Sequence, residues 1–314
     1  METKKKISLV VPCFNEEEGL SKFNETLLTA LPEKYEYELI YVNDGSSDKT
    51  VEVIKSLAQN HPEIKYISFS RNFGHQNALK AGYDFATGHC AISLDADLQH
   101  PPAVIPELIQ KWEEGFEIVN TIRLDHESIS AGKKLSSGIF YKLMRRMSDV
   151  NIETGMADFR LIDRKVLNQL KLFSENYLFF RGIIPWIGFK QVNVPFRANE
   201  RFAGTTKYTL KRMIKFAMTG VTSFSVKPLR LSIYLGIFIA FLAFIYAVYI
   251  TYIYFFTDYA ITGWTSVILS VLAVGGINLL MLGIIGEYLG KLFIENKRRP
   301  NYLISETNFE SWKI

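Results

Sequence analysis

Short apolar runs alternate with amphipathic segments from residue 7 to about residue 122. The apolar runs predict strands at Ile7–Val11, Leu39–Asn43, Ile64–Phe69, Ala91–Leu94 and Ile118–Ile122. Apolar residues at helical spacing predict helices between them, near 17–30, 48–60, 75–87 and 103–114. Strand and helix alternating at this spacing require crossover connections, so the pattern predicts a Rossmann-like α/β domain with a mostly parallel sheet covered on both faces.

Two much longer apolar runs follow, at 231–256 and 264–290. As helices they would extend about 39 and about 40 Å at 1.5 Å per residue, which is enough to cross a bilayer. Residues 231–290 contain no Lys or Arg and only two acids, Asp258 and Glu287. The composition therefore predicts a transmembrane hairpin, and a pair of buried core helices is the less favoured alternative.

Basic residues flank the hairpin on its outer ends and are missing from its connection, residues 257–263. By the positive-inside rule, the hairpin begins and ends in the cytoplasm. The N-terminal apolar run contains Pro12 and is followed by three Glu residues, so it is too short for a signal-peptide core. We expect a protein of the cytoplasmic membrane with two spans, whose N-terminal domain and both termini are cytoplasmic.

Two amphipathic stretches carry Lys and Arg opposite an apolar face, at 210–224 and 135–147. The first, just before the hairpin, is expected to lie on the membrane surface, because such helices bury their apolar face at the interface. The second fits surface binding or ordinary packing on the domain. The predicted organisation is a domain at 1–207, a juxtamembrane helix and linker at 208–230, the hairpin at 231–290 and a tail at 291–314.

The overall composition excludes several classes of protein. The chain has 314 residues, of which 48% are hydrophobic, and two cysteines, so it is neither disordered nor a disulfide scaffold. Cys13 and Cys90 lie in or beside apolar runs and are expected to be buried thiols in a reducing compartment. The formal charge of +4 includes a local basic excess, with seven Lys or Arg and no acid at 201–230, which does not suggest nucleic-acid binding.

Polar residues directly follow four of the predicted strands. The clusters are Pro12–Glu16, Asn43–Asp48, Ser70–His75 and Asp95–Gln99. Ligands of open α/β sheets bind beyond the carboxyl ends of the strands, so the four clusters should line one rim. An acid at such a place is costly unless it is paired, so the repetition indicates a polar ligand or a cation.

The pair Asp95 and Asp97 is the sharpest feature of this rim. Two carboxylates two residues apart, in a turn that leaves a strand, can approach one Mg²⁺ or Mn²⁺ that also binds substrate phosphates. A solvated turn is the alternative. No Gly-x-Gly-x-x-Gly motif follows the first strand and no P-loop motif occurs in the sequence, which disfavours nicotinamide cofactors and P-loop ATPases. The pattern points to a nucleotide-sugar donor.

These motifs resemble the GT-A glycosyltransferases of family 2. The matching segments are Val11–Glu17, Asn43–Thr50, Ser70–Gln76 and Asp95–Pro102. Arg201–Tyr208 and Gly286–Gly290 resemble the polyprenyl-phosphate and dolichyl-phosphate glycosyltransferase branch of that family. The resemblance covers nearly the whole chain.

The resemblance implies roles for individual residues. The nucleoside would be held by Pro12, Asn15, Glu16 and Asp44, with Asp44 at the base. The metal and the diphosphate would be organised by Asp95, Asp97 and Gln99. Further substrate contacts, several to phosphate, are expected from Arg71, Arg123, Lys133, Lys134, Arg201 and Lys207. Asp158 would lie near the sugar as a catalytic residue, although a structural salt bridge to Arg160 or Arg164 is the alternative; His75 and Gln76 would shape the site.

The implied activity is inverting transfer of one sugar from a nucleotide diphosphate to polyprenyl phosphate, with Mg²⁺ or Mn²⁺ as cofactor. UDP-glucose is the favoured donor, and GDP-mannose, UDP-N-acetylglucosamine or a modified sugar stay open. A processive synthase is disfavoured, because the sequence lacks the Gln-x-x-Arg-Trp motif and further spans. A non-enzymatic scaffold is disfavoured by the intact acids. A homo-oligomer, a separate flippase and a downstream glycosyltransferase are expected partners.

Overall fold

The computed structural model describes residues 4–124, 153, 155–176, 178–199, 225–256 and 263–310. Two units are distinguished by their internal contacts. The first contains the described residues up to 199 together with those from 300 onward, and it holds the sheet. The second contains the described residues from 225 to 299, which form two long helices.

The described part of the first unit contains one sheet of eight strands in the order β7-β5-β6-β4-β1-β2-β3-β8. The strands are β1 (Lys6–Cys13), β2 (Glu36–Asn43), β3 (Ile64–Phe69), β4 (Cys90–Ser93), β5 (Ile118–Leu124), β6 (Met156–Asp163), β7 (Gln191–Arg197) and β8 (Ile304–Thr307). The helical elements are α1 (Leu20–Ala30), α2 (Thr50–Asn60), α3 (His75–Phe85), η1 (Pro102–Val104), α4 (Ile105–Glu113), α6 (Arg164–Leu170) and α7 (Phe180–Trp186). All five strands predicted from the apolar runs are present.

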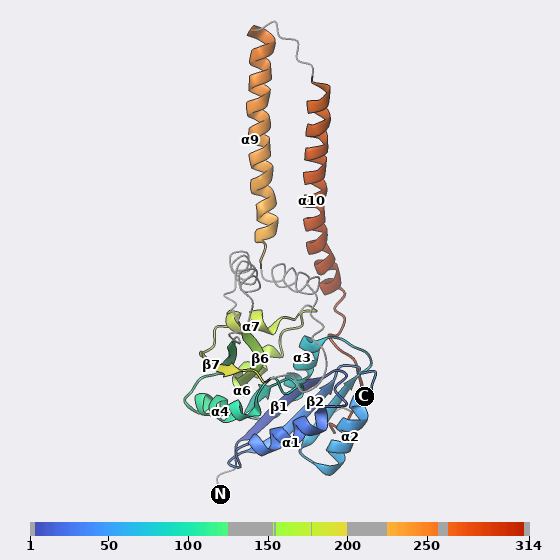
Figure 1. The fold of residues 1–314 in the computed structure, drawn as a ribbon, viewed down its shortest axis with the longest axis vertical. Coiled ribbons are helices and arrows are strands. Elements are labelled where there is room, and N and C mark those ends of the chain that lie inside the picture. Colours follow the sequence, from blue (N-terminus) through green and yellow to red (C-terminus); the bar gives the residue numbers. More distant parts are fainter. Residues whose placement is uncertain are drawn as a thin grey trace. The chain divides into compact units, whose positions relative to one another are not determined.

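The central strands β4, β1, β2 and β3 are parallel, and β6 and β8 each run antiparallel to a neighbour. Alternation of side chains across β1 divides its residues between the two faces. Leu9 joins the main core cluster with residues of α1, α2 and α4, whereas Val10 packs against α3. Figure 1 labels these four helices around the sheet. At Gly82 of α3, a Cβ atom would lie 2.1 Å from a methyl carbon of Val10, so this helix needs a glycine to approach the sheet. The predicted mostly parallel, two-faced α/β fold is confirmed.

The two cysteines are buried free thiols, as predicted. Cys13 ends β1 and Cys90 begins β4. Burial raises the pKa of the Cys13 thiol well above its ordinary value, and Glu16 and Asp95 add to this effect. The thiol therefore stays protonated and acts as a small core residue.

A buried carboxylate, Glu38, ties the amino ends of the central strands together. Its two oxygens accept hydrogen bonds from the hydroxyls of Ser8 (2.5 Å) and Thr87 (2.6 Å) and pair with Lys6 Nζ at 2.7 Å. Burial raises the pKa of this carboxyl, but the hydrogen bonds outweigh it and the net pKa is lowered. Glu38 lies at the edge of the sheet opposite to the predicted site, so its role is in stability.

Changing Glu38 to Gln should lower the free energy of unfolding by about 1–3 kcal/mol at pH 7, because charge-assisted hydrogen bonds are lost in the interior. The folded carboxyl has the lowered pKa, so its contribution is complete above the unfolded value of about 4.3 and is lost as the pH falls below it. Thermal unfolding of both proteins between pH 7 and pH 3 checks this. A stability difference that stays constant over this range would contradict the prediction.

The segment after the hairpin contributes a strand to the sheet. β8 pairs antiparallel with β3, Lys55 Nζ lies 2.7 Å from a carboxylate oxygen of Glu306, and Tyr302 stacks on Phe69 at 5.1 Å between ring centroids. The sequence analysis treated residues 291–314 as a separate tail, and here the structure differs. The four residues of β8 include Ser, Glu and Thr, and this composition does not predict a strand. They form a strand because they pair with β3.

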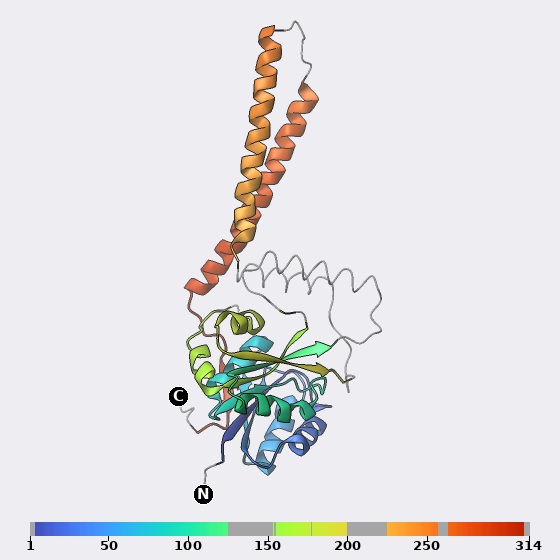
Figure 2. The same ribbon diagram turned by 90° about the vertical axis from the view of Figure 1, so that its left-hand side faces the viewer.

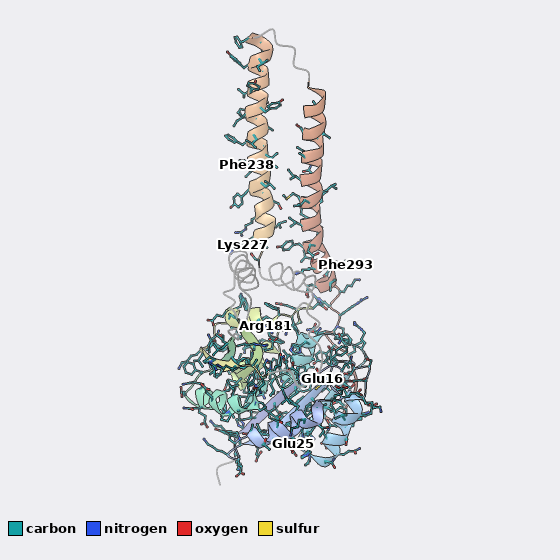
Figure 3. All side chains as sticks on the ribbon, viewed as in Figure 1. Glu16, Glu25, Arg181, Lys227, Phe238 and Phe293 are labelled. Carbon is teal, nitrogen blue, oxygen red and sulfur yellow. The ribbon has the colours of Figure 1, made fainter. Side chains whose placement is uncertain are left out.

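The second unit consists of α9 (Lys227–Phe256) and α10 (Trp264–Asn296), which run alongside each other in both views (Figures 1 and 2). Both are long and apolar enough to cross a membrane, over Ser232–Ile253 and Ala273–Asn296, and no side chain whose burial the structure describes is buried in either span. Their apolar side chains, Phe238 and Phe293 among them, stand out from the ribbons (Figure 3). A buried core pair is therefore excluded for these helices. They extend beyond the predicted limits, because α9 begins at Lys227 and α10 continues to Asn296.

Candidate functional site

The four polar clusters lie in the loops that follow β1, β2, β3 and β4, as the sequence predicted. Each loop contains one residue with a positive φ angle: Asn15 (57°), Gly45 (63°), Gly74 (98°) and Leu98 (60°). At Gly45, a Cβ atom would lie 2.3 Å from the carbonyl carbon of Arg71, so glycine lets the second and third loops touch. Sharp turns thus keep all four loops at the carboxyl edge of the parallel strands.

The first two loops are joined by hydrogen bonds of Asn15. Its backbone N–H donates to Ser46 Oγ at 3.0 Å, and its Oδ1 accepts the N–H of Ser47 at 2.9 Å. The N–H of Glu16 donates to Thr50 Oγ1 at 2.8 Å, at the start of α2. Asn15 and Glu16 therefore form one wall together with the loop after β2, where the sequence analysis placed the nucleoside.

Asp44 is buried and holds the third loop. Its carboxylate accepts the N–H groups of Phe73 (2.7 Å) and Gly74 (3.0 and 3.1 Å). Burial raises the pKa of Asp44, against the lowering effect of these N–H groups. The structure thus gives Asp44 a local task that the sequence did not indicate, and its expected contact with a base stays a prediction.

The loop that carries Asp95 and Asp97 is held by the side chain of His100 and by a hydrogen bond within the loop. His100 is stacked on Phe159, with ring centroids 5.3 Å apart, and its Nδ1 accepts the N–H of Asp95 at 3.0 Å. The N–H of Gln99 donates to Asp97 Oδ1 at 3.1 Å.

Leu98 packs at the edge of the core cluster, and its positive φ costs about 1–2 kcal/mol for a side chain with a Cβ atom. The carbonyl groups of Leu98 and Gln99 accept hydrogen bonds from the Asn199 side chain (3.4 Å) and backbone N–H (3.3 Å). A strained residue held in this way fixes the direction of the neighbouring carboxylates.

The donor set fits a divalent cation that is shared with a substrate. Asp95 and Asp97 lie two residues apart in one rigid turn, and the Asp95 side chain is 37% exposed. Among the described residues, no group of three or more His, Cys, Asp or Glu is arranged to hold a metal alone. Mg²⁺ is usually bound by one or two carboxylates, and its remaining ligands are phosphate oxygens and water. A site made entirely of protein ligands is unusual for this ion.

Asp158 lies at the centre of a second cluster. It is in the middle of β6, on the same side of the strand as Arg160, whereas Phe159 between them belongs to the main core cluster. Its carboxylate pairs with Arg160 Nη2 (3.0 Å) and Arg181 Nη2 (2.9 Å) and accepts a hydrogen bond from Gln76 Nε2 (3.3 Å). The salt bridge to Arg160 considered from the sequence is present, and Arg164 binds the carbonyl of Gly88 instead.

His75 connects the two clusters. Its Nε2 lies 3.5 Å from Asp95 Oδ1 and 3.9 Å from Asp158 Oδ2, and the imidazole is 42% exposed. Burial raises the pKa of Asp158, but Arg181, Arg160 and His75 outweigh it and hold the net value well below the ordinary range. Asp158 therefore stays ionised at neutral pH and is unsuited to taking up a proton.

The other predicted contact residues have varied positions. Pro12 is buried within β1; Arg71 is exposed, with its guanidinium 4.0 Å from the ring centroid of Phe73. Arg123 is exposed in β5, one residue before the end of that strand. Lys133, Lys134, Arg201, Lys207 and both predicted surface helices lie outside the described residues. The contributions of Arg181 and Asn199, which come from segments distant in the chain, were not predicted from the sequence. The contact of His100, five residues after Asp95 in the same loop, was not predicted either.

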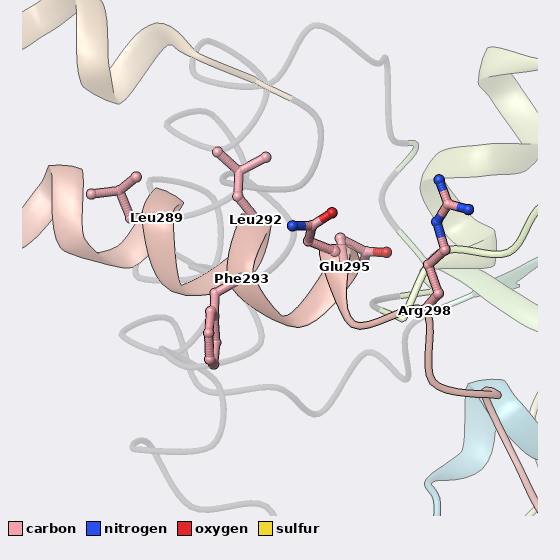
Figure 4. A pocket seen from close by; sticks show the side chains of 6 residues that line it. Leu289, Leu292, Phe293, Glu295 and Arg298 are labelled. Carbon is pink, nitrogen blue, oxygen red and sulfur yellow. The ribbon is translucent and has the colours of Figure 1, made fainter.

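A hollow of about 740 Å³ lies on the last turns of α10, in the other unit (Figure 4). It is lined by Leu289, Leu292, Phe293, Glu295, Asn296 and Arg298. None of the strand-end residues contributes to it. The chemistry-bearing side chains are at the edge of the sheet.

Comparisons with known proteins agree with this arrangement. The model of glycosyl transferase family 2 matches residues 8–171, and that of the GtrB C-terminal hairpin matches residues 227–292. An uncharacterized glycosyltransferase of Bacillus subtilis (strain 168), YkcC, is 44% identical over 301 residues, which cover 96% of this chain and 93% of that protein. A prophage bactoprenol glucosyl transferase homolog of Escherichia coli (strain K12) is 42% identical over 300 residues, covering 95% and 98%.

Among solved structures, the mannosyltransferase PcManGT from Pyrobaculum calidifontis, in complex with GDP-Man and Mn²⁺, is similar with a TM-score of 0.49 and 16% identity. The similarity covers 71% of this chain and 64% of that one. The match to the hairpin model and the two exposed apolar helices together indicate association with a membrane. The resemblance seen in the sequence is confirmed by the family models and by relatives that align over nearly the whole chain: the protein is a glycosyltransferase and belongs to glycosyl transferase family 2.

Proposed function

We propose that this glycosyltransferase moves one glucose residue from UDP-glucose to the phosphate of a polyprenyl phosphate at the cytoplasmic face of the membrane. One observation carries the proposal: this chain combines the acids at the strand ends with a hairpin of the GtrB type, and it is 42% identical, over 95% of its length, to a relative named for bactoprenol glucosyl transfer. The choice of glucose rests on that name, and the choice of UDP rests on the resemblance to bacterial members.

The reaction needs little acid–base chemistry from the protein. A phosphate monoester is already ionised at neutral pH, so no residue has to remove a proton from the nucleophile. Attack by the lipid phosphate in line with the departing diphosphate would invert the configuration at the anomeric carbon. Catalysis then depends on positioning and on stabilising charge as the nucleotide leaves.

Each strand-end loop has a part in this scheme. Asn15, Glu16 and Asp44 hold the nucleoside side of the donor, and Asp44 does so partly through the loop at Phe73 and Gly74. Asp95 and Asp97, with Gln99 beside them, would hold Mg²⁺ or Mn²⁺, which when bound neutralises developing charge on the diphosphate. Asp158, which stays ionised, orients groups around it rather than exchanging a proton.

The connectivity of the chain supports the membrane arrangement. The chain leaves the sheet-containing unit before α9 and returns to it after α10, where β8 joins β3. If both helices span the bilayer, the two ends of the hairpin lie on the side that carries the catalytic unit. The missing Lys and Arg in the connection at 257–263 favour the cytoplasm for that side. A homo-oligomer, a flippase and a downstream glycosyltransferase stay part of the proposal.

The proposal is tested with membranes that contain the full chain, incubated with radiolabelled UDP-glucose, UDP-N-acetylglucosamine or GDP-mannose and a polyprenyl phosphate. The expected result is a labelled, acid-labile lipid with UDP-glucose alone, formed only when polyprenyl phosphate and Mg²⁺ or Mn²⁺ are present. Labelling from another nucleotide sugar would correct the donor. No labelled lipid from any donor would contradict the proposed function.

A further inference from the structure

Two arginines surround one buried carboxylate in the second cluster of the site. Arg160 Nη2 lies 3.0 Å from Asp158 Oδ1, and Arg181 Nη2 lies 2.9 Å from Asp158 Oδ2. The side chains of Asp158 and Arg160 are 6% and 1% exposed, whereas that of Arg181 is 36% exposed. The two arginines are therefore in different surroundings although they share a partner.

Arg160 serves as the interior counter-ion. Besides Asp158, it donates to the carbonyl oxygens of Ala157 (2.8 Å) and Phe180 (3.5 Å), so its guanidinium is held by the protein on several sides. Burial lowers the pKa of Arg160, and the nearby charge of Arg181 lowers it further, so the two guanidinium groups repel each other. The guanidinium of Arg160 is thus held in the interior, whereas that of Arg181 lies on the more exposed side of the same carboxylate, where a ligand can approach it.

The protein fixes the position of Arg181 from two elements. Arg181 is the second residue of α7, and the N–H of Phe180, the first residue, donates to Gln76 Oε1 at 2.9 Å. The amide nitrogen of the same Gln76 side chain donates to Asp158. The backbone of this turn is thus bonded to the start of α3, and the Arg181 side chain is bonded to Asp158, which the same Gln76 contacts, so the guanidinium has little freedom to turn away.

The carboxylate that holds Arg181 is linked to the predicted metal loop through His75. His75 Nε2 stands between Asp158 Oδ2 (3.9 Å) and Asp95 Oδ1 (3.5 Å). Only one imidazole therefore separates the carboxylate that holds Arg181 from the carboxylate expected to bind the cation. Arg181 approaches this cluster from α7, whereas Asp95 and Asp97 lie in the loop after β4. Figure 3 labels it at the edge of its unit.

We propose that Arg181 binds a phosphate group of a substrate and that Asp158 orients its guanidinium for this contact. The inference rests on the proposed function, in which both the donor diphosphate and the lipid acceptor carry phosphate. A guanidinium presents its donors in a planar fork that matches phosphate oxygens, and charge-assisted bonds of this kind are strong when partly shielded from water. Asp158 is thus a positioning residue for Arg181.

The test compares the wild-type full-length protein in detergent with Arg181→Gln, Arg181→Lys and the control Lys171→Gln, which removes one exposed positive charge from the same unit. Initial rates are measured first with varied UDP-glucose at saturating polyprenyl phosphate, and then with varied polyprenyl phosphate at saturating UDP-glucose. Arg181→Gln should raise KM for one substrate by about 10- to 100-fold, which corresponds to the loss of a hydrogen bond to a charged group. Arg181→Lys keeps the charge without the fork and should give a smaller increase, and the control none.

The two sources of phosphate are distinguished by the KM that rises. A higher KM for polyprenyl phosphate assigns the contact to the acceptor, and a higher KM for UDP-glucose assigns it to the donor. If Arg181→Gln leaves both values within twofold of wild type, whatever happens to kcat or to thermal stability, the contact is only structural and the inference is wrong. If Arg181→Gln does not fold, Arg181→Lys is judged by the same criterion.

A wild-type protein that transfers no sugar would contradict the proposed function without deciding the role of Arg181. In that case, binding of UDP with Mn²⁺ and binding of farnesyl phosphate are titrated separately to the wild type and to Arg181→Gln. Weaker binding of either probe by tenfold or more supports the inference. Equal binding of both probes overturns it.

Discussion

Replacing Asp97 with Asn should reduce glycosyl transfer at least about a hundredfold. The change removes one charge from the pair expected to hold the cation, and a bound cation supplies several kcal/mol of charge stabilisation when the diphosphate leaves, with each 1.4 kcal/mol worth a factor of ten. The rigid turn at Leu98 should keep the backbone unchanged. Rates of lipid glycosylation in washed membranes, with and without EDTA and over a Mn²⁺ titration, check this.

The matched control is Glu107→Gln, because Glu107 is an exposed acid on α4 and its replacement also removes one negative charge from the same unit. It should keep wild-type activity and the wild-type response to Mn²⁺. In the wild type, EDTA should abolish activity and Mg²⁺ or Mn²⁺ should restore it. Unchanged activity of Asp97→Asn, or full activity of the wild type in EDTA, would remove the metal from the proposal.

Replacing Asp158 with Asn should lower the free energy of unfolding by about 3–5 kcal/mol. The variant leaves Arg160, which is 1% exposed, without its counter-ion in the protein interior, and breaking one side of a buried ion pair has a cost of this size. Because the pKa of Asp158 is held below its ordinary value, the contribution is complete above about pH 3.9 and is lost at lower pH. Thermal and denaturant unfolding of the purified protein at pH 7 and pH 3 measure both effects.

The double variant Asp158→Asn with Arg181→Gln provides the comparison. Since Arg181 adds to the repulsion felt by Arg160, its removal should recover part of the lost stability, and the two effects should not be additive. A loss below about 1 kcal/mol in the single variant would mean that the cluster is more hydrated than its burial indicates. Strict additivity would show that the two arginines do not interact.

The apolar pattern was sufficient to predict the strands that carry the first four loops. Residues such as Val10 and Leu9 are buried on both faces of the sheet, so β1 is a continuous apolar run that stands out from its surroundings. β5 was predicted as well, whereas β6 and β7 are less distinct. β6 places Asp158 and Arg160 on one face, and β7 contains Asn193 and Pro195, so neither gives a simple alternation.

The positions of Asp44, Asp95 and Asp97 in the loops that follow the strands were predictable, because polar residues directly follow apolar runs there. The site was not predictable where a side chain reaches it from a distant segment. Arg181 is 23 positions from Asp158 in the chain, in a segment whose only evident pattern is apolar. A single sequence without a fold offers no means of pairing those two residues. For the same reason, the hydrogen bond between the Asn199 side chain and the turn at Leu98 could not be predicted from the sequence.

The pairing of β8 with β3 has a consequence for biogenesis. β8 is translated after both apolar helices, so β3 is an edge strand of the sheet until β8 has been made and pairs with it. An unpaired edge strand is a template for association with other chains. Maturation of the sheet is therefore coupled to the order of synthesis. A chain terminated between α10 and Ile304 would contain both apolar helices but would leave β3, instead of the short β8, as the edge strand.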